Sequence, residues 1–180
     1  FAVIIALLAG CAPKPSAPET PPQKTPPETT TPGTTPDAVT TASIVGDADA
    51  FKKAISSNGT WIICATKDLS INEDLVLEGD FHDKNDPTKD LKRKIALYAQ
   101  DADKNVTARY TLTAPKLTIK SPNARIQGGT FKGDVYVSAK NFELADATVD
   151  GNVYFTTDDA KSGFKVDDKS KVTGKQELKK

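Results

Sequence analysis

The sequence predicts an all-β fold, a right-handed parallel β-helix (solenoid) of about four to five coils with a short N-terminal capping helix. Three observations lead to this prediction. Short runs of alternating apolar residues fill the chain after Thr60, and these runs align with one another at a spacing of eighteen residues. Each repeat also carries, at the same place, a residue that tolerates left-handed backbone.

The charge balance excludes one class of partner. The 180 residues hold 24 basic and 24 acidic side chains, so the chain lacks the excess of positive charge that nucleic-acid binding requires. We therefore expect no nucleic-acid partner. Prolines divide the chain into two parts, because nine of the twelve fall between Pro13 and Pro36.

The first residues have the properties of an export signal. Phe1 to Leu8 are apolar and uncharged, too few to span a bilayer but typical of the hydrophobic region of a signal peptide. The run ends in Leu8-Ala9-Gly10-Cys11, which resembles the lipobox of bacterial lipoproteins. The resemblance implies that residues 1–10 are a signal peptide whose start is missing. It also implies that Cys11 carries acyl chains such as palmitate, which anchor the protein to the outer face of the cytoplasmic membrane.

Residues 11–42 are predicted to be a disordered linker that begins at the lipidated Cys11. They are rich in Pro and Thr and lack apolar periodicity, so they cannot bury enough surface to offset the entropy lost on ordering. An extended chain of this length would reach about 90 Å from the membrane. Residues 43–180 are predicted to form the folded domain, in which Cys64 is interpreted as a buried structural thiol.

A short amphipathic helix is expected where the domain begins. Asp47 or Asp49 is a suitable N-cap, and Phe51, Ala54 and Ile55 share one face. In the predicted fold this helix covers the first coil.

The eighteen-residue repeat is clearest where residues 123–137 align with residues 141–155. Asn and Gly recur at one position of the repeat and predict a sharp left-handed bend with stacked amides; these residues are Asn105, Asn123, Asn141 and Gly163. The alternating apolar residues are expected to point inward. They are Ile63, Leu69, Ile71, Leu75, Leu77, Leu117, Ile119, Ile126, Val135, Val137, Phe142, Leu144, Val149, Val153, Phe155, Phe164 and Val166.

These features resemble the β-solenoids of the pectate-lyase type, in which a helix caps the first coil and an asparagine ladder marks one turn. They also resemble the polymer-forming bactofilins, whose coils are similarly short. The likeness extends over residues 47–174 and concerns architecture. It brings no catalytic motif of either family.

Four outward residues are candidates for binding. Tyr136 and Tyr154 are predicted to stack into an aromatic strip that binds a sugar ring or a protein, or that simply stabilises the sheet. Arg125 and Lys132 are the cations of two columns of alternating charge, Arg125 with Glu143 and Lys165, and Lys132 with Asp150. The structural interpretation is that opposite charges meet between neighbouring strands.

An enzymatic alternative assigns Arg125 or Lys132 as the base of a uronate lyase, such as a pectate- or alginate-type enzyme, with calcium held by Asp134 and Asp150. The sequence offers no cluster of acids that favours it, so we expect no catalytic residue, no metal and no cofactor.

The segment Asp80–Asp103 interrupts the repeat and is expected to loop out, either covering or forming a site. It contains His82, the only histidine, which excludes a site built from several histidines. Residues 101–105 imitate half of a calcium loop but lack its later glycine and glutamate.

The leading functional hypothesis is a bacterial cell-surface lipoprotein with a non-catalytic structural or binding module. Its partner would be cell-wall or extracellular polysaccharide, or a protein, including end-to-end association with another copy.

Overall fold

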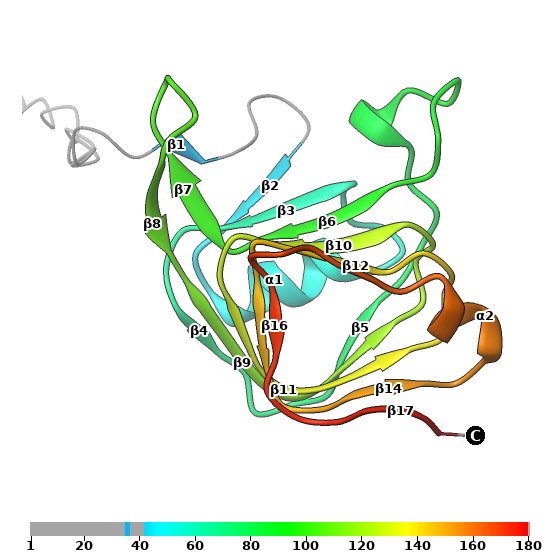
Figure 1. Cartoon of the computed structure of the whole chain (residues 1–180). Coiled ribbons are helices and arrows are strands. Elements are labelled where there is room, and N and C mark those ends of the chain that lie inside the picture. The colour runs from blue at the N-terminus through cyan, green and yellow to red at the C-terminus, as the bar shows by residue number, and fades with distance from the viewer. Residues whose placement is uncertain (1–34, 37–41, 180) are drawn as a thin grey trace, which may run out of the picture. The chain divides into compact units, whose positions relative to one another are not determined.

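The computed structural model describes residues 35–36 and 42–179 (Figure 1). The predicted signal peptide 1–10 and the lipidation site Cys11 lie outside these residues, as does most of the predicted linker 11–42. Two pieces of that linker are described as strands: β1 is Thr35–Pro36, and Ala42 opens β2.

One of the two larger sheets is parallel throughout and has six strands in the order β15-β12-β10-β6-β3-β2. Because side chains alternate between the two faces of a strand, one face of this sheet points to the core and the other points outward. The strands are β2 Ala42–Val45, β3 Ile62–Ala65, β6 Arg93–Ala96, β10 Ala124–Gln127, β12 Glu143–Ala145 and β15 Lys165–Val166.

The other parallel sheet has eight strands. The two long strands β9 and β11 run side by side at its centre, and shorter strands pair with their two halves. The strands are β4 Leu69–Ser70, β5 Leu75–Leu77, β9 Thr111–Ile119, β11 Thr130–Val137, β13 Thr148–Asp150, β14 Val153–Phe155, β16 Lys171–Val172 and β17 Gln176–Leu178.

The third sheet is antiparallel and joins β1 to the hairpin of β7 (Tyr98–Gln100) and β8 (Val106–Arg109). The hairpin turns at Asp101, whose carboxylate accepts hydrogen bonds from the backbone and the side-chain amide of Asn105. The residues that imitate half of a calcium loop are therefore a hairpin turn.

The predicted fold class is wrong. The described chain is a mixed, mostly sheet structure whose short strands divide among three sheets, one of them antiparallel, and helices interrupt them; these strands form no closed solenoid of four to five coils. The difference from the prediction has a local physical reason. The repeat predicts that every eighteen-residue unit contributes a strand and a bend. The chain instead reverses at Asp101, where side-chain hydrogen bonds stabilise a hairpin.

The eighteen-residue alignment nevertheless predicts the strand register correctly. Arg125 lies opposite Glu143, Thr130 opposite Thr148, and Tyr136 opposite Tyr154.

The asparagine column is confirmed only in its middle. Asn123 and Asn141 have positive φ of 52° and 59°, and the amide of Asn141 donates to the side-chain oxygen of Asn123 at 2.9 Å. Asn105 lies instead in the hairpin turn, where Lys104 has the positive φ, and Gly163 has a φ of −84°. Only two of the four predicted bends share one conformation.

The predicted helix is present as α1, Ala48–Ile55, with Asp47 as its N-cap accepting from the backbone N–H of Ala50 at 2.8 Å. Two further helical segments, α2 (Asp158–Ser162) and the 3₁₀ turn η1 (Asp83–Asn85), follow later in the chain. Within the described residues, none of the helices has the length and apolar character to cross a membrane.

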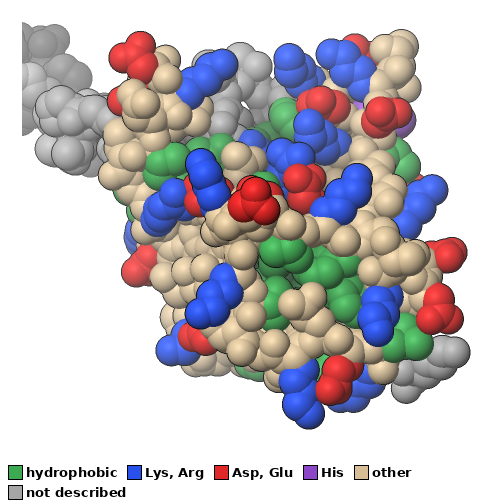
Figure 2. Space-filling view, in the orientation of Figure 1, with side chains coloured by type: hydrophobic (Ala, Val, Ile, Leu, Met, Phe, Trp, Pro, Cys, Tyr) green, Lys and Arg blue, Asp and Glu red, His purple; other side chains and the backbone are tan. Residues whose placement is uncertain are grey.

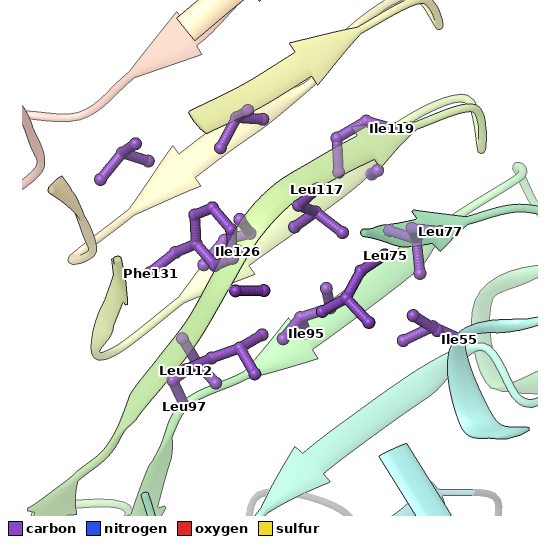
Figure 3. Packing of buried hydrophobic residues seen from close by; sticks show 14 of the residues in the cluster. Ile55, Leu75, Leu77, Ile95, Leu97, Leu112, Leu117, Ile119, Ile126 and Phe131 are labelled. Carbon is purple, nitrogen blue, oxygen red and sulfur yellow. The ribbon is translucent and has the colours of Figure 1, made fainter. Parts of the chain in front are cut away.

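The larger of two buried apolar clusters lies between the two parallel sheets, with α1 packed against it (Figure 3). A smaller cluster contains Ile62, Cys64, Ala96 and Tyr98. Side chains from strands far apart in sequence meet in the larger cluster, for example Ile95 of β6 and Leu117 of β9, both fully buried. Of the inward positions predicted, all are buried except Phe164, which is partly buried, and Val166, which is 42% exposed. Figure 2 shows an apolar patch between β16 and α2 on this side of the molecule.

Gly133 allows β11 to bend beside β9. The pairing of the two strands shifts register between Lys132 and Asp134, and Gly133 between them has a φ of 140°. A Cβ at this position would overlap the carbonyl oxygen of Ala114 in β9. The position therefore requires glycine, both for its backbone angle and for the close approach of the neighbouring strand.

Only the first half of the segment Asp80–Asp103 loops out as expected. Its second half contains β6, a central strand of the six-stranded sheet, and β7 of the hairpin. Strand β6 is hard to recognise in the sequence because it begins with the charged residues Arg93 and Lys94, although Ile95 and Leu97 alternate as strand residues do.

Candidate functional site

The predicted aromatic strip is present on the outer face of the eight-stranded sheet. The rings of Tyr136 and Tyr154 are 5.0 Å apart between centroids and tilted by 45°. The ammonium group of Lys179 lies 4.5 Å from the ring centroid of Tyr154 and 5.5 Å from that of Tyr136, and it donates to the Tyr136 hydroxyl at 3.3 Å. These contacts favour a role in stabilising the sheet, because a lysine of the same chain occupies the position of a stacked ligand.

Lys132 lies on this same sheet, opposite Asp150, and is exposed. The two acids of the lyase hypothesis are both engaged in hydrogen bonds: Asp134 accepts from the backbone and side chain of Asn152, and Asp150 accepts from Thr173. The fourth candidate, Arg125, lies on the six-stranded sheet. The four predicted binding residues thus divide between two sheets.

A polar pocket of about 530 Å³ lies beside Arg125. Its floor is formed where β10, β12 and β15 present their outward residues, and its wall is the loop between η1 and β6. It is lined by Asp83, Thr88, Lys89, Asp90, Leu91, Lys92, Asn123, Arg125, Asn141, Glu143 and Lys165. The loop therefore forms a site with Arg125 and has no part in the aromatic strip.

The floor is the charged column that the alignment predicts. Arg125 lies opposite Glu143, and Glu143 lies opposite Lys165. The Nε and Nη2 groups of Arg125 both donate to Oε2 of Glu143, at 3.0 and 2.7 Å. This pair fixes the direction of the guanidinium group. In the described part of the chain, Lys165 has no ion-pair partner.

Contacts within the loop hold the wall of the pocket. Lys92 forms an ion pair with Asp83 at 3.3 Å, and the His82 ring contacts the carbonyl oxygen of Lys89 at 2.5 Å. Asp86 accepts from the backbone and hydroxyl of Thr88, and these hydrogen bonds lower the pKa of its carboxyl group. His82 thus contributes a structural contact to the wall.

A cation that the sequence analysis missed lies next to Arg125. Lys94 of β6 is its partner in the strand register, and both lie on the outer face of the sheet. Burial lowers the pKa of Lys94 to about 8, and the positive charge of Arg125 lowers it further in the same direction.

Arg93 was also missed, and its role is structural. Its side chain is fully buried, and it donates to the carbonyl oxygens of Ala54 and Ser56 at the end of α1, at 2.7 and 3.0 Å. It also donates to the carbonyl of Glu78 at 2.7 Å, and its guanidinium lies 3.9 Å from the ring centroid of Phe81. Burial lowers the pKa of Arg93 to about 10, which leaves it charged at neutral pH.

The pocket presents charged groups of both signs together with amides and a hydroxyl, so it suits a polar ligand such as a carbohydrate. Within residues 35–36 and 42–179, no three His, Cys, Asp or Glu side chains are grouped so that they could hold a metal ion. Cys64 is fully buried, as expected.

Comparisons with known proteins found no match. No family model fits the chain, and neither the curated proteins nor the solved structures that were searched contain a significant relative. The likeness to bacterial lipoproteins, based on the residues around Cys11, therefore stays a prediction.

Proposed function

We propose that the chain is a non-catalytic binding module of a bacterial cell-surface lipoprotein, and that it holds cell-wall or extracellular polysaccharide in the pocket beside Arg125. The observation that carries the proposal is the pocket itself. Cations, carboxylates, asparagine amides and a hydroxyl line it, on rigid strands on one side and a short loop on the other.

Two features of the pocket support binding without catalysis. Arg125, which the lyase hypothesis would use as a base, donates through Nε and Nη2 to Glu143, so its guanidinium group is already engaged within the sheet. Lys132, the other proposed base, lies on the eight-stranded sheet and does not line the pocket.

Binding is tested by sedimentation of the full chain with purified cell wall and by titration with soluble extracellular polysaccharides. We expect retention that weakens about tenfold or more in the Arg125→Ala, Lys165→Ala double variant, because each hydrogen bond to a charged group contributes about 1.5–3 kcal/mol. Tyr136→Ala is the matched control and should bind as the unchanged chain does.

Three results would contradict the proposal. Absence of retention on every wall fraction and polysaccharide would reject polysaccharide binding. Association of the chain only with itself or with another protein would show that its partner is a protein and not a polysaccharide. Release of unsaturated uronate products would show a lyase.

The surface location depends on Cys11 and has its own test. Expressed in a bacterial host with an initiator Met and basic residues added before Phe1, the chain should incorporate a labelled fatty acid and partition into the membrane fraction, whereas Cys11→Ser should remain unlabelled and soluble. Cys64→Ser is the control, because Cys64 is buried in the fold and should not affect labelling. Equal labelling of the Cys11 variant and the unchanged chain would reject the lipobox interpretation.

A further inference from the structure

A second polar pocket, of about 380 Å³, lies at the corner where the chain passes from the six-stranded sheet to the eight-stranded sheet. Three threonines lie in register along its floor: Thr111 of β9, Thr130 of β11 and Thr148 of β13. All three residues are partly buried, and within the described part of the chain none of their hydroxyl groups forms a hydrogen bond. The floor therefore offers three neighbouring hydroxyl groups to a ligand that carries hydroxyl groups of its own.

Contacts within the chain fix the rim of this second pocket. Arg109 donates to the carbonyl oxygen of Gly128 at 2.6 Å and to the carboxylate of Asp146 at 2.6 Å. The carboxylate of Asp167 accepts from the backbone N–H groups of Asp146 and Lys169, at 3.0 and 3.2 Å. The turn that carries Lys169 is thus held in place. The side chain of Lys169 lines the pocket, is exposed, and has no ion-pair partner among the described residues.

Three stretches of chain line both this pocket and the pocket beside Arg125. Each stretch contributes one residue to the pocket beside Arg125 and, four or five positions later, one residue to the second pocket. These pairs are Arg125 and Thr130, Glu143 and Thr148, and Lys165 and Lys169. Because an extended chain spans at most about 3.6 Å per residue, the paired residues are no more than about 18 Å apart.

Between the two pockets, β12 presents a small side chain. Glu143 and Ala145 are the outward residues of this strand, since Leu144 between them is fully buried. Ala145 carries only a methyl group, and Asp146, which follows it, already lines the second pocket. The chain turns at Asp146, whose φ is 51°. A chain-like ligand that can bend at this corner therefore passes from one pocket to the other over Ala145.

We infer that the second pocket is a further subsite for the polysaccharide held beside Arg125, and that one glycan chain occupies both pockets. The inference rests on the proposed function and adds to it a second subsite and a minimum length of ligand. The threonine hydroxyl groups and the ammonium group of Lys169 bind sugar hydroxyl groups there. Binding at the second pocket is then intramolecular, so a glycan that reaches both pockets binds more tightly than one that fills either alone.

The test is a series of glycans of increasing length. The probes are cell-wall glycan strands cut with a muramidase and extracellular polysaccharide cut by partial acid hydrolysis, both separated by length and titrated calorimetrically against the full chain. We expect the affinity to rise by at least about tenfold once a fragment is long enough to reach both pockets, and to change little beyond that length. Shorter fragments should occupy the pocket beside Arg125 alone.

Substitutions in the second pocket should remove this effect of length. Thr148→Val combined with Lys169→Met removes a hydroxyl group and a charged donor, so it should weaken binding of long fragments about tenfold or more and leave binding of short fragments unchanged. Valine has nearly the shape of threonine and is favoured in β-strands, so the sheet should be preserved. Thr118→Val combined with Lys175→Met is the matched control, because it makes the same two changes outside both pockets.

The two hypotheses fail differently. The Arg125→Ala, Lys165→Ala double variant should weaken binding of short and long fragments alike. Equal affinity of the unchanged chain for short and long fragments would overturn the second subsite while leaving the proposed function intact. The same conclusion would follow if the variant of Thr148 and Lys169 bound long fragments as tightly as its control does. Failure of the unchanged chain to bind fragments of any length from either source would reject the proposed function itself.

Discussion

Replacing Arg93 by methionine should lower the free energy of unfolding by about 3–5 kcal/mol, because one buried and two partly buried carbonyl oxygens lose a charged donor. Two of these carbonyls, on Ala54 and Ser56, lie at the C-terminal end of α1, where a positive charge is also favourable to the helix dipole. The fork of the guanidinium thus joins β6 to the end of the helix and to the segment after β5. Urea unfolding followed by circular dichroism measures the loss.

Two further variants separate the geometry of Arg93 from its charge. Arg93→Lys keeps the charge, but a single ammonium group cannot span three carbonyls, so we expect an intermediate loss. Lys120→Met removes an exposed cation paired with Glu78 at 3.5 Å and should cost about 1 kcal/mol or less. If Arg93→Met proved as mild as Lys120→Met, the guanidinium would not be what holds α1 in place.

Gly133→Ala is expected to destabilise the protein by about 2–6 kcal/mol, combining a strained backbone with a steric overlap. At a φ of 140°, alanine is disfavoured whatever space surrounds it. The added methyl group would also overlap the carbonyl of Ala114, which belongs to the rigid backbone of β9 and cannot rotate away. Because β9 and β11 are the central strands, the whole eight-stranded sheet should be affected.

Gly46→Ala is the matched control for this substitution. A Cβ there would lie 3.3 Å from the hydroxyl oxygen of Thr66, a side chain that can adjust. Thermal unfolding should show a large decrease in melting temperature for Gly133→Ala and a small change for Gly46→Ala. Similar melting temperatures for the two variants would mean that the register shift in β11 does not depend on glycine.

Local signals predicted the start of the helix, and the repeat predicted much of the strand pairing. Asp47 has the side chain of an N-cap, and the predicted helix begins directly after it. The alignment placed Arg125 opposite Glu143 because both positions follow the same alternation, and the structure adds the ion pair that the charges imply. Such features depend on neighbours along the chain or one repeat away, which a sequence displays directly.

The fold class was not predictable from the same pattern. A repeat shows which strands align, but it does not show that Asp101 binds Asn105 and reverses the chain into an antiparallel hairpin. The burial of Arg93 was also not predictable, since a charged residue in the sequence suggests a surface loop. Its burial depends on carbonyl groups 15 to 39 residues away in sequence.

Only part of the candidate site could be predicted from the sequence, for a similar reason. Arg125 was identified, whereas Lys94 was assigned to an outlooping segment, so its contact with Arg125 was missed. The tyrosines were correctly placed on one face, but Lys179, which lies 43 residues from Tyr136, covers them. Side chains that arrive from distant segments decide whether a predicted surface is open.

The strand register also bears on the order in which the chain assembles. Each strand after β11 pairs with residues that precede it by 18 to 23 positions. Loops of this length cost little entropy to close, and an existing strand edge supplies the hydrogen-bonding template for the next strand. The second half of the protein can therefore be added strand by strand as it leaves the ribosome, with β15, β16 and β17 the last to join.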